Sequence, residues 1–256
     1  MGTLNLESMV SAAMFIGVRV SGLMLFMPFL SSPGFPSPVK AVLTLAVTAL
    51  LYPVHRPELP GSGALGWVGV VSGELMVGML LGLAVQFVIE AAQMAGHILG
   101  VQAGYSLVTL LDPQTQADTP VMATFNQLVA LLIFLQLNVH HWLLRGLAAS
   151  FTYLPPGSAL SNLKAGAGLL RAAGGIWLVG VQIAAPVVVA TVLVDVSLGF
   201  LAKASPQMPV LFVGLSIKTV LSLVVFAGTL ALWPRLLEHR FAAGIVLGER
   251  LLHLAR

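Results

Sequence analysis

Long runs of apolar residues make up most of this chain, and short groups of polar residues, glycine and proline separate them. A run of about 20 apolar residues can cross the hydrocarbon core of a bilayer as a helix. The pattern predicts six such spans, of which the second is short and the fifth is long. They are Met9–Leu30, Val39–Val54, Leu65–Ile89, Val121–Val139, Ala173–Ala202 and Val210–Trp233.

The segment between the third and fourth spans differs from its neighbours. Its first part, Glu90–Leu111, has a helical pattern but carries several polar side chains, so we expect a helix buried against protein. The sequence then reads "GYSLVTLLDPQTQADTP" from Gly104 to Pro120. Its prolines break any helix, and its polar side chains cannot face lipid without losing their hydrogen bonds. This loop must therefore face water or other protein.

Composition supports a membrane protein. Of 256 residues, 58% are hydrophobic and 8% are charged, against roughly 25% charged in an ordinary soluble domain. The net charge of +3 comes from scattered basic residues, which excludes the basic patch of a nucleic-acid-binding protein. Cysteine is absent, so a cysteine-based metal site or nucleophile is excluded. The fold class predicted is an all-α integral membrane protein of about six hydrophobic helices, some broken by proline or glycine.

The distribution of basic residues predicts the orientation. An even number of spans places both ends on one side, and the loops of that side are the more basic ones. Its basic residues are Arg56, Arg145, Lys164, Arg171, Arg235, Arg240, Arg250 and Arg256. We therefore expect cytoplasmic ends and an exterior polar loop. The tail after Pro234 has apolar residues at helical spacing, which predicts an amphipathic helix lying on the membrane or on a partner.

Two basic residues fall inside predicted spans, Arg19 and Lys218. Each charge costs a few kcal/mol or more at the centre of a bilayer unless it is compensated. Three acids, Glu74, Glu90 and Asp195, are available as partners. The sequence favours pairing within the chain, and the alternative is a relay that moves a substrate across the membrane.

Two sets of glycines recur at a spacing of four residues: Gly78 and Gly82, then Gly96, Gly100 and Gly104. Each set leaves a flat strip on one helix face, where a second helix can approach closely. The spacing predicts tight helix packing, within the chain or against other subunits.

No arrangement of residues typical of a membrane enzyme is visible. There is no H-E-x-x-H motif and no pair of acids in a common helical register. His140 and His141 are adjacent, so on a helix they would point about 100° apart, and we interpret them as a loop anchor. We expect a protein that is not an enzyme, with no cofactor and no metal.

Three stretches carry a family resemblance: "RVSGLMLFMPFLSSPGFPSPVKAVLTLAVT", "GVQAGYSLVTLLDPQTQADTPVMATFNQLVALLIFLQLNVHHWLLR" and "LVDVSLGFLAKASPQMPVLFVGLSIKTVLSL". Together they resemble the FliR family of flagellar export-gate proteins, to which the SctT proteins of injectisomes are similar. The resemblance spans nearly the whole chain. The residues with matched spacing are Arg19, Pro28, Pro36, Lys40, Asp112, Pro113, Asn126, Asn138, Pro186, Gly199, Pro206 and Lys218.

The resemblance implies a pore-forming assembly in which this subunit joins FliP-type and FliQ-type subunits, largely lifted out of the bilayer plane. It implies a FliP-like part at 1–155, a FliQ-like helical hairpin at 156–233, and a basic amphipathic helix at 234–256 that faces a FlhB-type switch protein. The location implied is the bacterial inner membrane, in the flagellar basal body.

The resemblance also gives the polar loop a role, because the matching loop at 105–119 acts in the family as a plug that closes the pore. The plug residues expected are Tyr105, Ser106, Leu107, Leu110, Leu111, Asp112, Pro113, Gln114, Thr115 and Asp118. The alternative is an exposed connector. The residues expected at subunit contacts or at polar positions within the membrane are Arg19, Lys40, Glu90, Asn126, Asp195 and Lys218.

The function expected is that of a pore-forming structural subunit of a flagellar type III export gate, through which unfolded proteins pass. An injectisome gate is the nearest alternative. A secondary transporter is a third possibility, opposed by the absence of inverted repeats and of an acid cluster at mid-membrane depth. An intramembrane hydrolase would need a nucleophile and a base that the sequence does not offer.

Overall fold

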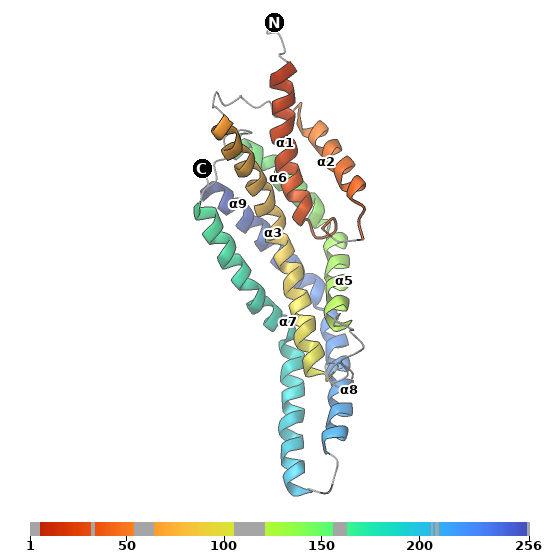
Figure 1. The fold of residues 1–256 in the computed structure, drawn as a ribbon. Helices are drawn as coiled ribbons and strands as arrows, with labels where there is room; N and C mark the ends of the chain where they lie inside the picture. The colour runs from red at the N-terminus through yellow and green to blue at the C-terminus, as the bar shows by residue number, and fades with distance from the viewer. Residues whose placement is uncertain are drawn as a thin grey trace. The chain divides into compact units, whose positions relative to one another are not determined.

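A computed structural model describes residues 6–31, 34–53, 64–104, 121–155, 163–205, 207 and 210–254 (Figure 1). Within these ranges the chain forms helices and no strand, as the composition predicted. The helices are α1 (Leu6–Phe26), α2 (Ser37–Leu51), α3 (Ala64–Gln102), α5 (Val121–Gln136), α6 (Val139–Tyr153), α7 (Leu163–Ala204), α8 (Val210–Leu230) and α9 (Trp233–Leu254).

Proline, glycine and asparagine mark several helix ends. Helix α1 stops before Pro28, which has no N–H to donate to the preceding turn. Helix α2 begins directly after Pro36 and carries Pro38 in its first turn, where the missing N–H costs nothing. After α3, Gly104 has a φ of 85°, a conformation that glycine adopts without a steric penalty. Asn138, at φ 55°, separates α5 from α6.

The chain divides into two compact units that alternate along the sequence. Unit 1 comprises Met1–Phe87, Phe134–Ala173 and Arg240–Arg256. Unit 2 comprises Val88–Ile133 and Gly174–His239. The division at residue 155 predicted from the resemblance concerns likeness to other subunits, and it stays a prediction.

In unit 1, α1 lies beside α2 and the first half of α3 (Figure 1). One face of α1 is fully buried, with Phe15, Ile16, Val20 and Leu23 at spacings of a helical stripe. Phe15 stacks on Trp67 of α3 with ring centroids 5.1 Å apart.

The other part of unit 1 joins the end of α5 to the C-terminal helix. Phe241 of α9 meets Phe134 edge to face, at 5.7 Å between ring centroids. Gly244 also lies against α3, where an added Cβ would come within 2.8 Å of the carbonyl oxygen of Ala84. The prediction that α9 is amphipathic matches its sequence, but its apolar residues Leu237 and Phe241 are covered within the chain and do not lie on a membrane surface.

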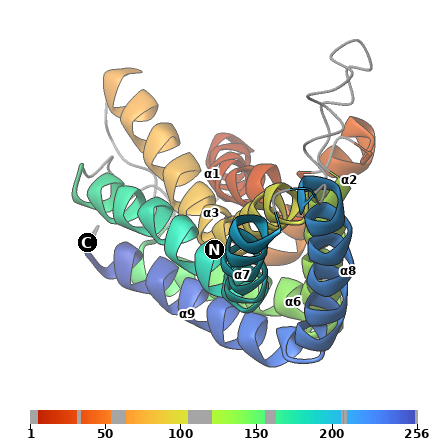
Figure 2. The same cartoon turned by 90° about the horizontal axis from the view of Figure 1, so that it is seen from below.

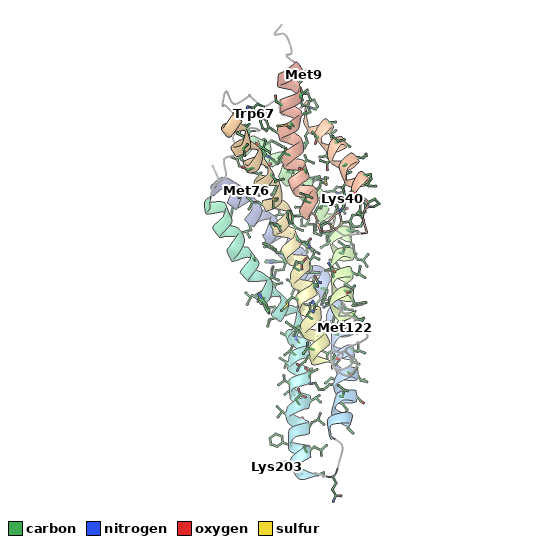
Figure 3. The ribbon with its side chains drawn as sticks, viewed as in Figure 1. Met9, Lys40, Trp67, Met76, Met122 and Lys203 are labelled. Atoms are coloured by element: carbon green, nitrogen blue, oxygen red, sulfur yellow. The ribbon has the colours of Figure 1, made fainter. Side chains whose placement is uncertain are left out.

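In unit 2, the later part of α7 and helix α8 run side by side as an antiparallel hairpin (Figure 1). Figure 2 looks along this hairpin from the end where α7 stops and α8 begins. The helices touch closely at Gly214, because a Cβ there would come within 2.6 Å of a methyl group of Leu198. Lys203, labelled in Figure 3, lies in the last turn of α7.

The structure contains fewer candidate membrane spans than the six predicted. Among the described residues, four helical segments are long and apolar enough to cross a membrane: Met9–Phe26, Gly66–Gln102, Ala173–Ala204 and Val213–Leu230. Helices α5 and α6 form a pair bent by 65° that would make a fifth span if counted as one. Helix α2 has only 15 residues, about 22 Å, which is short of a bilayer core of about 30 Å. Four spans still form an even number, as the predicted orientation requires, whereas the bent pair counted as one further span would make five.

Three details of the helices also differ from the prediction. The polar segment that begins at Glu90 is not a separate helix, because α3 continues through it as one helix of 39 residues to Gln102. The interpretation of His140 and His141 as a loop anchor is wrong, since both lie in the first turn of α6 with ring centroids 4.2 Å apart. The predicted span ending at Val139 stops at Gln136.

Candidate functional site: two ion pairs and the anchors of the polar loop

Arg19 is the centre of a buried polar cluster in unit 1, and its side chain is fully enclosed. Its Nε donates to Glu74 Oε2 at 2.6 Å, joining α1 to α3. Its Nη1 donates to Ser150 Oγ at 3.0 Å, and its Nη2 donates to the carbonyl oxygen of Leu154, also at 3.0 Å. The guanidinium also lies 4.2 Å from the ring centroid of Phe151. One side chain therefore ties α1 to α3 and to the end of α6.

This cluster follows from the cost of burying a charge. A buried ion needs a counter-charge and hydrogen bonds for its remaining polar groups. Glu74 supplies the charge, and it is fully buried as well. The Ser150 hydroxyl accepts a hydrogen bond from Arg19 and donates one to the carbonyl oxygen of Leu147 at 2.6 Å. The carbonyl of Leu154 lies at the C-terminal end of α6, where the helix dipole favours a positive charge.

Close packing of α1 on α3 holds the ion pair in place. Gly78 lies against the main-chain carbonyl of Arg19, and Gly82 lies against Phe26, whose Cβ would be 2.9 Å from an added Cβ. On α1, Gly22 lies against α3 in the same way, since an added Cβ there would come within 2.5 Å of the carbonyl oxygen of Leu75. The α3 glycines at 78 and 82 thus face α1 of the same chain.

The second ion pair lies in the hairpin of unit 2. Lys218 Nζ of α8 donates to Asp195 Oδ2 of α7 at 2.8 Å. Unlike the Arg19 pair it is open, because the Asp195 side chain is 48% exposed and the Lys218 side chain 19%. Both basic residues placed in spans by the sequence therefore have an acidic partner in the same chain.

The ends of the polar loop are anchored by a close crossing of α3 and α5 in unit 2. Gly96 packs against the main chain of Met122 and Ala123, where a Cβ would lie 2.5 Å from the Cα of Ala123. Figure 3 labels Met122 at the start of α5. Asn126 is fully buried, and its Nδ2 donates to the carbonyl oxygen of Ala92 at 3.3 Å. Its Oδ1 has no hydrogen-bond partner in the described part of the chain.

The remaining predicted residues fall outside these clusters. Gly100 has room for a Cβ, at 3.8 Å from Met122, and Gly104 serves the turn after α3 instead of a helix face. Lys40 and Glu90 are half-buried. Tyr105, Ser106, Leu107, Leu110, Leu111, Asp112, Pro113, Gln114, Thr115 and Asp118 lie outside the described residues.

Sequence reasoning missed the neutral members of the Arg19 cluster. Ser150 lies 131 positions after Arg19, and Leu154 lies 135 positions after it. No local pattern links residues so far apart, and a serine in a helix usually bonds only to its own preceding turn. Of the residues predicted at subunit contacts, Arg19 and Asn126 are fully buried in the chain and offer no surface to another subunit. Asp195 is exposed and can make such a contact.

Comparison with known proteins gives the family. A model of bacterial export proteins, family 1, matches residues 10–244. The chain is 31% identical to the flagellar biosynthetic protein FliR of Escherichia coli (strain K12) over 232 residues, which are 88% of this chain and 86% of that protein. It is 36% identical to FliR of Bacillus subtilis (strain 168) over 155 residues, 59% of this chain and 60% of that one.

A secretion protein is also similar. The secretion system apparatus protein SsaT of Salmonella typhimurium is 26% identical over 175 residues, which are 68% of this chain and 66% of that protein. These matches confirm the family resemblance drawn from the sequence. With the family model covering most of its length, this membrane protein belongs to family 1 of the bacterial export proteins.

Proposed function

We propose that this chain is a pore-forming structural subunit of the flagellar type III protein-export gate in the bacterial inner membrane, and that it is not an enzyme. The observation that carries the proposal is the 31% identity to E. coli FliR along 88% of the chain. In this role the subunit surrounds unfolded exported proteins in transit, and other components supply the energy.

The hairpin of unit 2 supports contact with other subunits. Only 28% of the span in α7 and 17% of the span in α8 is buried inside the chain. Its surface is mostly apolar but carries the open Asp195–Lys218 pair. Lipid gives such a pair no hydrogen bonds in return, so a protein surface with polar groups suits it better. We therefore assign this surface to FliP-like and FliQ-like subunits.

Helix length supports an assembly that rises out of the bilayer. Helix α3 has 39 residues and α7 has 42, which correspond to path lengths of about 58 Å and about 63 Å. A bilayer core is only about 30 Å thick. Parts of both helices then lie beyond the hydrocarbon layer and contact water or protein.

The exposed side of α9 is the surface left for a FlhB-like switch protein. Leu237 and Phe241 are covered by the chain itself, whereas Arg235, Glu238 and His239 are exposed. A charged helix face suits a polar, reversible contact.

The polar loop at 105–119 is proposed as the plug of the pore. Its sequence cannot face lipid, and both flanking helices are held by the Gly96 crossing and the Asn126 hydrogen bond. Because its prolines exclude a continuous helix, such a loop between two fixed ends can be displaced at modest cost.

The experiment measures ion leakage through membranes of cells that co-express the gate subunits. Intact protein is compared with a variant that lacks Leu110–Asp118. We expect more leakage on deletion while the complex still assembles. Unchanged leakage in an assembled complex would make the loop a connector and remove the plug role.

An injectisome gate is the second candidate, because SsaT matches 68% of this chain. Deletion of the gene distinguishes the two systems. Loss of swimming, restored by the intact gene, supports the flagellar role, whereas loss of protein secretion with normal swimming supports the injectisome role.

A secondary transporter is opposed by the pairing of Arg19 and Lys218 within the chain, since neither side chain is left to carry a substrate. Purification separates these classes of protein. A transporter is stable alone or as copies of itself, but a gate subunit co-purifies with unlike partners.

A further inference from the structure

Helix α5 is apolar on nearly all of its sides. Of its 16 residues, four carry polar side chains: Thr124, Asn126, Gln127 and Gln136. A helix that is apolar all round has no polar face to turn outward, so its hydrophobic pattern does not determine which side packs on a neighbour. Some other feature must select the side of α5 that faces α3.

The two sides of α5 differ in size and in exposure. The inward residues are small or medium-sized and buried: Ala123, Ala130 and Ile133. The outward residues are larger and 75%, 55% and 66% exposed: Val121, Leu128 and Leu132. In apolar surroundings the outward residues have no hydrophobic reason to stay outside, because lipid and protein interior are similarly apolar.

Asn126 is the polar residue on the inward side, and it is fully buried. Its Nδ2 donates to the carbonyl oxygen of Ala92 at 3.3 Å. The neighbouring residue on the next turn of α3 is Gly96, and its missing Cβ allows the main chain of α5 to approach closely. The amide therefore reaches a backbone oxygen of α3 that a larger residue at position 96 would keep at a distance.

Stability alone does not account for an asparagine at this position. Its Oδ1 has no hydrogen-bond partner in the described part of the chain, and a buried polar atom without a partner is unfavourable. A leucine of similar size would avoid this cost, and the carbonyl of Ala92 would keep its bond within α3. If α5 turned its other side to α3, however, Asn126 would lose its one hydrogen bond and face apolar surroundings. The amide thus disfavours the wrong packing more than it stabilises the right one.

We propose that Asn126 is a specificity-determining residue that selects which side of α5 packs on α3. Its hydrogen bond to Ala92 keeps the small residues inward and the side with Val121, Leu128 and Leu132 outward. The outward side is then available to a neighbouring gate subunit, a consequence that rests on the proposed function.

One other contact also distinguishes the two sides of α5. Phe125 meets Phe226 of α8 edge to face, with ring centroids 5.9 Å apart. The Phe125 side chain is 43% exposed, so this pair is only partly enclosed. The experiment therefore includes Phe125→Leu, which removes the aromatic pair and keeps the asparagine.

Cysteine labelling measures which side of α5 faces outward, because the natural chain contains no cysteine. Leu128→Cys reports on the outward side and Ala130→Cys on the inward side, each in the full chain purified in detergent and treated with N-ethylmaleimide. Ile133→Cys is a second inward reporter in case Ala130→Cys does not fold. Both reporters are combined with Asn126→Leu, with Phe125→Leu, and with Gln127→Leu as the matched control one position away.

In the intact background Leu128→Cys should react at least about tenfold faster than Ala130→Cys. Loss of one hydrogen bond changes a population by about two- to tenfold, so Asn126→Leu should reduce this ratio by about that factor. Gln127→Leu should leave the ratio unchanged. Thermal unfolding separates selection from support: Tm of Asn126→Leu should equal or exceed that of the intact chain, whereas an ordinary core residue would show a lower Tm with the labelling ratio retained.

The selecting role is wrong if the ratio in Asn126→Leu stays at the intact value, or if Phe125→Leu abolishes it and Asn126→Leu does not. Co-purification with the other gate subunits tests the consequence for assembly, and Asn126→Leu should recover fewer of them. An unchanged recovery together with a reduced ratio would show that the outward side of α5 is not a subunit contact. If the intact chain itself recovers no unlike subunit while the ratio responds as expected, the proposed function fails and the selection by Asn126 stands.

Discussion

Removal of the Glu74 carboxylate tests the buried ion pair most directly. In Glu74→Leu, Arg19 stays fully buried with only a hydroxyl and a carbonyl as acceptors. Loss of one partner from a buried ion pair costs about 3–5 kcal/mol, because the other charge is left uncompensated. The double variant Arg19→Met, Glu74→Leu removes that charge, and such replacements in other proteins are often neutral or stabilising. We therefore expect the double variant to be more stable than Glu74→Leu.

Thermal unfolding of the purified full chain in detergent measures the effect, with the fluorescence of its 4 tryptophans as the signal. Glu74→Leu should lower Tm on the order of 10 °C, and the double variant should recover most of this loss. Glu238→Leu is the matched control, since Glu238 is exposed on α9 and its replacement should shift stability by less than about 0.5 kcal/mol. The reasoning fails if Glu74→Leu unfolds like the intact chain, or if the double variant is less stable than either single one.

Three further substitutions test the packing, the open ion pair and the bend. Gly78→Ala should cost about 1–3 kcal/mol, because its Cβ meets a carbonyl of α1, whereas Gly69→Ala, with nothing within 4 Å, should gain about 0.5–1 kcal/mol in the same unfolding assay. Asp195→Asn should change the stability of the isolated chain by less than about 1 kcal/mol but reduce co-purification of partner subunits; an unstable chain that still binds its partners would contradict this. Asn138→Val should cost about 1–2 kcal/mol and Asn138→Gly almost nothing, because the backbone there is left-handed at φ 55°, and equal effects of the two would be the contrary result.

The apolar pattern was sufficient to predict most helices, because any long apolar segment in a membrane must satisfy its own backbone hydrogen bonds. It was a poor guide to where helices end. Glu90 lowers the hydropathy of α3 without breaking it, since glutamate is a good helix former. The bend between α5 and α6 occurs at Asn138, which has a left-handed conformation. No proline or glycine at this position signals the bend in the sequence.

The sequence predicted that the basic residues within the spans would have acidic partners, but it did not predict which acid pairs with which base. Arg19 and Lys218 in apolar surroundings required acidic partners, and Glu74 and Asp195 are the acids that the structure supplies. Glu74 lies 55 positions from Arg19, so its selection over Glu90 depended on how α1 crosses α3. The hydrogen bond from Thr219 Oγ1 to the carbonyl oxygen of Ala103 could not be predicted either, because a threonine in an apolar helix is ordinary and its partner lies 116 positions away.

The open hairpin has a consequence for the life of the protein in the cell. A newly inserted chain that meets no partner leaves most of α8 and the Asp195–Lys218 pair uncovered in the bilayer. Quality-control proteases recognise orphan subunits through such surfaces, and assembly hides them. The abundance of this protein should therefore follow the synthesis of its partners, and an excess of its messenger RNA alone should yield rapid turnover instead of more protein.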